Sequence, residues 1–158
     1  MITVIPSLEV MKSVTDNNIQ SSGADLRRQA FDRATNLMTL GNVEVLLEGL
    51  IFERIEPKLS QAHKIIFQSG YRIDNSAKGL STTYNHTQAL SFVANSESKS
   101  RKVIIITENM SDYKSVCNGT VIAVNPSLFI EKVDKAIENY RKRTFSNIDD
   151  SLNALFFL

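Results

Sequence analysis

The chain is poor in the sulfur and imidazole groups that bind soft metals or close disulfides. Its 158 residues include one cysteine, two histidines and no tryptophan. A single cysteine, Cys117, excludes an internal disulfide framework and any zinc site built from several cysteines. His63 and His86 are too few for an ordinary structural zinc site. A metal bound by this chain would therefore be held mainly by oxygen ligands.

Excess charge of one sign and long apolar runs are also missing. The formal net charge is +1, with 18 basic and 17 acidic side chains. This balance excludes a protein coated in basic residues for tight nucleic-acid binding, but it allows a local basic groove. No uncharged apolar run approaches the roughly 18 residues of a membrane span, and the first ten residues carry no basic leader. We expect a soluble, cytoplasmic protein with no membrane partner.

Apolar runs typical of strands alternate with segments of helical periodicity, and the length suits one ordinary domain. This order predicts an α/β fold: a three-layer α/β/α sandwich with a mainly parallel sheet and helices on both faces. We expect a single domain over residues 1–158, with a helical tail from about residue 145. The strands are expected at residues 2–5, 43–47, 103–107 and 120–124, and the helices at 24–40, 49–59, 85–94 and 128–143. Residues 8–15 alternate weakly, as in a further strand, and residues 69–84 read as a long loop.

Polar side chains follow the expected strands, where sites collect in such sheets. Glu108, Asn109 and Asp112 come directly after the clearest strand. Asp16 follows the strand-like piece that ends at Thr15. Glu53 lies on the helix expected at 49–59, after the strand at 43–47. Converging carboxylates are hard ligands that suit Mg²⁺ or Mn²⁺. A metal held in this way could activate water and neutralise the charge of a phosphodiester.

Two segments in the second half of the chain carry a family pattern: residues 101–113 are R-K-V-I-I-I-T-E-N-M-S-D-Y, and residues 121–133 are V-I-A-V-N-P-S-L-F-I-E-K-V. They resemble the PIN-domain nucleases, which include the ribonuclease toxins of toxin–antitoxin pairs. The match is to a strand, a T-x-(D/N)-x-x-D-(F/Y) loop, a second strand and a helix that begins at a proline. Residues 16–18, D-N-N, are similar to the family's opening D-x-N. The helix at 85–94 is similar to the one that supplies a further aspartate.

The resemblance implies a PIN-like domain that hydrolyses RNA phosphodiesters with Mg²⁺ or Mn²⁺. Asp16, Glu53 and Asp112 would then be the catalytic acids and metal ligands, and Asn18 would orient one of them. The chain also departs from the family pattern. Asn109 stands where many members have an acid, and Asn85 stands near the position of a further aspartate. Both amides would lie around the metal ligands without being ligands themselves.

Two alternatives remain open at this point. Asn109 and Asn85 supply oxygen without charge and would bind a divalent cation more weakly than carboxylates do. If residues 2–5 are the true first strand, the position of Asp16 in the family pattern falls near Ser7 and the acid is lost. The sequence therefore predicts either a metal-dependent endoribonuclease or a catalytically inactive PIN-like module that binds a protein or RNA partner at the same edge.

Basic side chains on two helices are candidates for phosphate contacts. Arg27, Arg28 and Arg33 lie on the helix at 24–40 and are the predicted RNA-binding residues. Residues 141–143, R-K-R, end another helix, where cations also offset the helix dipole. Besides RNA, the partners we expect are a protein inhibitor, as for a toxin, or a second copy of the chain. The apolar end, residues 154–158, would pack on the body or on such a partner.

Overall fold

The computed structural model describes residues 1–79 and 85–158. It contains a five-stranded sheet in which every neighbouring pair is parallel, in the order β3-β2-β1-β4-β5. The strands are β1 (Ile2–Pro6), β2 (Val43–Glu48), β3 (Arg72–Asp74), β4 (Lys102–Ile106) and β5 (Val121–Val124). The predicted α/β class with a parallel sheet is therefore confirmed.

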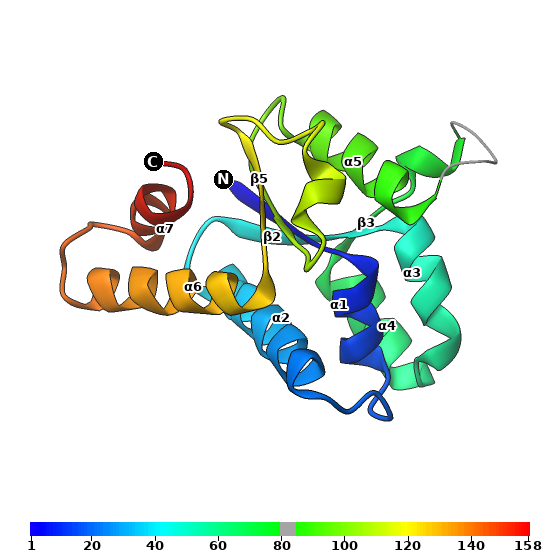
Figure 1. Cartoon of the computed structure of the whole chain (residues 1–158). Coiled ribbons are helices and arrows are strands. Elements are labelled where there is room, and N and C mark those ends of the chain that lie inside the picture. Colours follow the sequence, from blue (N-terminus) through cyan, green and yellow to red (C-terminus); the bar gives the residue numbers. More distant parts are fainter. Residues whose placement is uncertain (80–84) are drawn as a thin grey trace.

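Helices cover both faces of the sheet (Figure 1). They are α1 (Leu8–Thr15), α2 (Ser22–Leu40), α3 (Gly49–Ile55), α4 (Gln61–Gly70), α5 (His86–Glu97), α6 (Pro126–Arg141) and α7 (Ile148–Phe156), with short 3₁₀ turns η1 (Glu56–Lys58), η2 (Ser76–Gly79) and η3 (Met110–Tyr113). In Figure 1, α5 lies above the sheet and α2, α4 and α6 lie below it. Within residues 1–79 and 85–158, no helix has both the length and the hydrophobicity that crossing a bilayer requires.

The core lies around the two central strands. Val4 and Ile5 of β1 and Ile104 and Ile105 of β4 are fully buried. These runs consist of β-branched residues because a central parallel strand is covered on both faces and has no solvent side for polar groups. The uniform apolar character that predicted the strand at 103–107 is the direct consequence of this burial.

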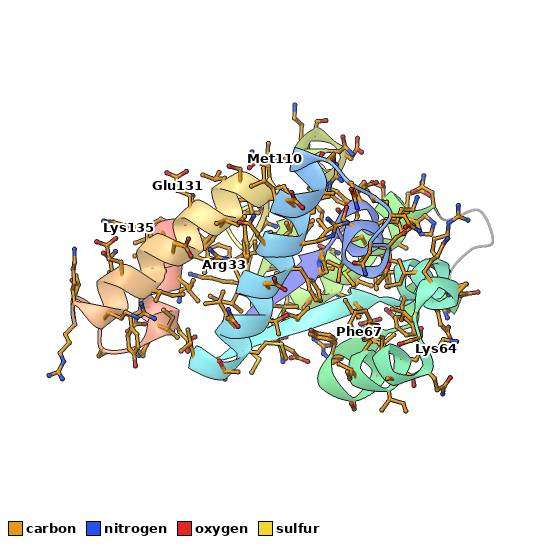
Figure 2. All side chains as sticks on the ribbon, turned by 90° about the horizontal axis from the view of Figure 1, so that it is seen from below. Arg33, Lys64, Phe67, Met110, Glu131 and Lys135 are labelled. Atoms are coloured by element: carbon orange, nitrogen blue, oxygen red, sulfur yellow. The ribbon has the colours of Figure 1, made fainter. Side chains whose placement is uncertain are left out.

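Helix α2, expected at residues 24–40, begins two residues earlier, at Ser22. The Ser21 hydroxyl caps it by accepting a hydrogen bond from the Ala24 N–H at 3.1 Å, which satisfies one of the free donors of the first turn. Further along, Arg33 pairs with Asp134 of α6 at 2.9 Å between Nε and Oδ1. Figure 2 shows Arg33 on α2 beside α6. The two helices therefore form one layer on this face.

Two expectations about local structure are wrong. Residues 8–15 form helix α1, because Val10 and Val14 lie one helical turn apart and Met11 joins them on the covered side. The expected loop at 69–84 contains the end of α4, strand β3 and η2; residues 80–84 lie outside the described part. Strand β3 has one apolar residue, Ile73, and is half-buried, so its sequence carries little strand signal.

The C-terminal segment packs onto α6 through α7. The Ser151 hydroxyl is buried and donates a hydrogen bond to the Ala136 carbonyl at 2.7 Å. The rings of Phe129 and Phe156 lie 5.7 Å apart between centroids. The apolar side chains of the final helix therefore pack largely against the body of the same chain.

Candidate functional site

The strand order reverses between β1 and β4, and in parallel sheets ligands bind beyond the carboxyl ends at such a point. Ser7 and Thr107 follow these two strands directly, and both are buried. The Ser7 N–H donates to the Ile106 carbonyl at 2.9 Å, and the Asn109 N–H donates to the Thr107 hydroxyl at 3.0 Å. Among the described residues, the Ser7 hydroxyl has no hydrogen-bond partner. This position in the sheet therefore carries hydroxyls where a metal centre would need carboxylates.

The acid at the end of β2 is Glu48, which is not among the site residues predicted from the sequence. Its side chain is buried and accepts hydrogen bonds from the Leu50 N–H, at 2.6 Å to Oε1, and from the Ile51 N–H, at 3.4 Å to Oε2. Burial raises the pKa of Glu48, and the two backbone N–H groups oppose this rise. Glu48 is therefore the N-cap of α3. Its sequence signal was an acid between an apolar run and a glycine.

Asp16 does not lie at the end of a strand, contrary to the prediction. It follows the last residue of α1, and its N–H donates to the Lys12 carbonyl at 3.0 Å. Its carboxylate accepts a hydrogen bond from the backbone N–H of Asn18 at 3.0 Å. This is an Asx turn that ends a helix. The amide side chain of Asn18 takes no part in that bond.

Asp16 and Glu53 nevertheless line one cavity of about 490 Å³ between α1 and the segment formed by α3 and η1. We call it the α1–α3 cavity. Its lining residues are Lys12, Thr15, Asp16, Ile19, Glu53, Arg54, Ile55, Pro57 and Lys58. Glu53 also pairs with Lys78 at 3.1 Å, which offsets part of its charge.

Asp112 lines a different space, a groove of about 420 Å³ between α5 and η3. The other lining residues there are Thr87, Gln88, Ser91, Phe92, Asn95, Ser115 and Val116. The structure therefore brings Asp16 and Glu53 together but not the three predicted ligands. Over the described ranges, no three His, Cys, Asp or Glu side chains are grouped so that they could hold a metal.

The two remaining asparagines, Asn85 and Asn109, both stand at the start of a helical turn. Asn85 caps α5 by accepting from the Gln88 N–H at 2.8 Å, and the Gln88 side chain accepts from the Asn85 N–H at 3.2 Å. This reciprocal pair is a capping box. The main-chain carbonyl of Asn109 accepts from the Asp112 N–H at 3.0 Å at the start of η3, and the Asn109 side chain makes no capping hydrogen bond. Neither amide lines the α1–α3 cavity.

The three arginines predicted to bind RNA are engaged within the chain. Arg27 donates from Nη2 to Oε2 of Glu108 and from Nη1 to the Ser13 hydroxyl, both at 3.1 Å. Arg28 donates from Nε to the Ser13 carbonyl at 2.7 Å. Arg33 holds α6 through its pair with an aspartate of that helix. Their contacts join α2 to α1, to the segment after β4 and to α6.

Three other cations line the α1–α3 cavity: Lys12, Arg54 and Lys58, all exposed. In the part of the chain that the structure describes, none of them forms an ion pair within 4 Å. Burial lowers the pKa of His86, and the positive charges of Arg54 and Lys12 lower it further. The positive charges of Arg54 and Lys12 therefore act on the start of α5, beside the cavity.

Comparisons of the chain with family models, with curated proteins and with solved structures gave no match. The side chains of the α1–α3 cavity and of the carboxyl edge are therefore the basis for assigning a function. In the cavity, the unpaired cations Lys12, Arg54 and Lys58 lie beside the carboxylates of Asp16 and Glu53, and the carboxyl edge adds buried hydroxyls.

Proposed function

We propose that this chain is a catalytically inactive PIN-like module that binds RNA through phosphate contacts in the α1–α3 cavity. One observation carries the proposal: Lys12, Arg54 and Lys58 line the same cavity and have no carboxylate partner among the described residues. Exposed cations that are not already paired are available to replace the counterions of a phosphate backbone. The resemblance of residues 101–133 to the PIN nucleases favours RNA as the polyanion.

The side chains at the carboxyl edge support binding without hydrolysis. Metal-assisted attack on a phosphodiester needs carboxylates that converge on one ion and on the water that it activates. Ser7 and Thr107 supply hydroxyls there, and the Glu48 carboxylate already accepts the N–H groups of α3. The carboxylate of Asp112 lies in another groove. These side chains support binding without cleavage.

The number of cations in the cavity determines how steeply the RNA affinity falls as the salt concentration rises. Contacts from Lys12, Arg54 and Lys58 would neutralise up to three phosphates. For single strands the logarithm of the affinity falls against the logarithm of the salt concentration with a slope of about −0.7 for each phosphate. We therefore expect a slope of about −2 for single-stranded RNA.

The test is fluorescence anisotropy with a labelled single-stranded RNA of mixed sequence at several salt concentrations. Arg54→Ala with Lys58→Ala should weaken binding at least tenfold and bring the slope nearer to zero, since two phosphate contacts are lost. The matched control is Lys99→Ala with Lys114→Ala, which removes two exposed lysines outside the cavity. Equal weakening in the two double variants would contradict a site at the α1–α3 cavity.

A metal-dependent ribonuclease is the second candidate, because Asp16 and Glu53 line one cavity. Two carboxylates with several waters can hold Mg²⁺ or Mn²⁺. Labelled RNA incubated with Mn²⁺ and the protein separates the candidates. Cleavage that requires Mn²⁺ and is lost in Asp16→Asn would support the nuclease and overturn the inactive module. Binding without cleavage would support the module.

A further inference from the structure

A second cavity lies at the C-terminal end of α6 and has a volume of about 400 Å³. Its lining residues are Tyr140, Arg141, Arg143, Phe145 and Ser146. They provide two guanidinium groups, two aromatic rings and a hydroxyl, and no carboxylate is among them. In Figure 1 this end of α6 lies at the left, whereas α1 and α3 lie on the right. The cavity is therefore separate from the α1–α3 cavity.

The backbone presents one of these guanidinium groups in an unusual way. Arg143 has a φ of 59° and is the one non-glycine residue with positive φ in the described part of the chain. It follows the residue that ends α6, and its N–H donates to the Tyr140 carbonyl at 2.9 Å. Glycine is the usual residue at this position because it has no Cβ to clash. An arginine that stands here against this preference suggests a use for its side chain.

Within the part of the chain that the structure describes, one of the three cations at this helix end is paired with a carboxylate and two are not. Lys142 pairs with Glu138 at 2.7 Å. Arg141 and Arg143 form no ion pair with a carboxylate among the described residues. Cations at the end of a helix also offset its dipole, but that effect requires neither a cavity nor aromatic neighbours. Two unpaired guanidinium groups beside two rings are arranged for a ligand with an anionic and a planar part.

We propose that this cavity binds a nucleotide. Its phosphate would lie between Arg141 and Arg143, since guanidinium groups bind phosphate oxygens in pairs. Its base would stack on Tyr140 or Phe145, as bases do on exposed aromatic rings. The same chemistry is offered by a free mononucleotide and by the terminal nucleotide of an RNA strand. The inference goes beyond the proposed function, because it concerns a separate cavity.

Calorimetric titration with AMP, adenosine and inorganic phosphate tests the chemistry of the site. AMP should bind at least tenfold more tightly than either of the other two, because only AMP carries both parts. A 5′-phosphorylated RNA tetranucleotide then distinguishes the two sources, since a site for strand ends would bind it more tightly than AMP. The proposal is overturned if neither probe binds, or if AMP binds no more tightly than phosphate and adenosine.

Arg143→Gly separates a ligand role from a structural one. Glycine suits the backbone at φ 59°, so the melting temperature should stay the same or rise while binding of AMP weakens at least tenfold. Lys142→Gln is the matched control, because it removes one charge from the same helix end but lies outside the cavity. Binding should stay within twofold in this control. Unchanged binding in Arg143→Gly, or equal weakening in the control, would overturn the site.

The proposed function and this inference fail independently. The double variant Arg54→Ala with Lys58→Ala should weaken binding of the long RNA but bind AMP as the unmodified protein does. Loss of AMP binding in that double variant would place the nucleotide in the α1–α3 cavity and overturn the assignment to the end of α6.

Discussion

Gly49 lies directly against Asn75: a Cβ at Gly49 would come within 2.2 Å of the Asn75 Oδ1 and 2.9 Å of the Asp74 carbonyl oxygen. The turn that leaves β2 therefore packs against the segment that leaves β3. Only glycine permits this approach without displacing one of the two segments. The same turn holds Glu48 in place as the N-cap of α3, so this contact orders one side of the carboxyl edge.

Gly49→Ala is expected to destabilise the fold. The Asn75 side chain can move aside, but the Asp74 carbonyl is backbone and moves only with the chain, so a cost of about 1–3 kcal/mol is expected. The measurement is the free energy of unfolding from urea denaturation. Gly70→Ala is the control, because a Cβ there meets nothing within 4 Å. Similar losses of stability in both variants would contradict a steric role for Gly49.

The elements that the sequence predicted correctly are those whose burial is uniform along their length. β4 reads as a strand because Val103, Ile104, Ile105 and Ile106 are covered on both faces, and α2 has both a capping serine and a long apolar stripe. α1 was misread because eight residues contain only two helical turns. Over that length the helical and the alternating patterns differ at few positions.

The candidate site was predicted less well, for two physical reasons. The weak alternation of residues 8–15 predicts a strand with Asp16 at its carboxyl end, whereas in the structure Asp16 follows helix α1. The cations Lys12 and Arg54 lie on different helices, and their common cavity exists only because α1 packs near α3. Neither position carries a motif. Glu48 shows the same limit, since its capping role depends on the conformation of its side chain.

Glu44 of β2 pairs with Arg72 of β3 and with Arg101, the residue directly before β4, in a charged network. Its Oε1 lies 2.5 Å from Arg72 Nε and its Oε2 lies 2.5 Å from Arg101 Nη1. Burial would raise the pKa of Glu44, but hydrogen bonds from the two arginines and their charges outweigh it, and the pKa is lowered. The ionised carboxylate therefore stabilises the folded state above the ordinary glutamate pKa of about 4.3.

Glu44→Gln should lower the free energy of unfolding at pH 7 by about 1–3 kcal/mol, because the hydrogen bonds to two charged groups are weakened. The difference from the unmodified protein should shrink as pH falls from the ordinary glutamate pKa of about 4.3 through the lowered pKa of Glu44 in the folded state. Urea denaturation at pH 7, 5 and 3 measures both effects. Glu138→Gln, which removes an exposed pair with Lys142, should leave stability nearly unchanged because solvent screens that pair. A constant difference for Glu44→Gln at every pH would contradict an ionic role.

Glu48 should show the opposite dependence on pH. Burial raises its pKa despite the N–H groups of Leu50 and Ile51, so the folded state keeps a proton at pH values where the unfolded chain has lost it. Stability linked to Glu48 is therefore fully present below about pH 4.3 and declines as pH rises through the raised pKa. Glutamine does not titrate and keeps one acceptor oxygen for the Leu50 N–H. The unmodified protein should exceed Glu48→Gln in free energy of unfolding most in acid, and this difference should shrink toward pH 7. Its difference from Glu44→Gln should grow toward pH 7. Urea denaturation of both variants between pH 3 and pH 8 measures this contrast. If the stability difference changed with pH in the same direction for both variants, Glu48 would not be held as a buried cap.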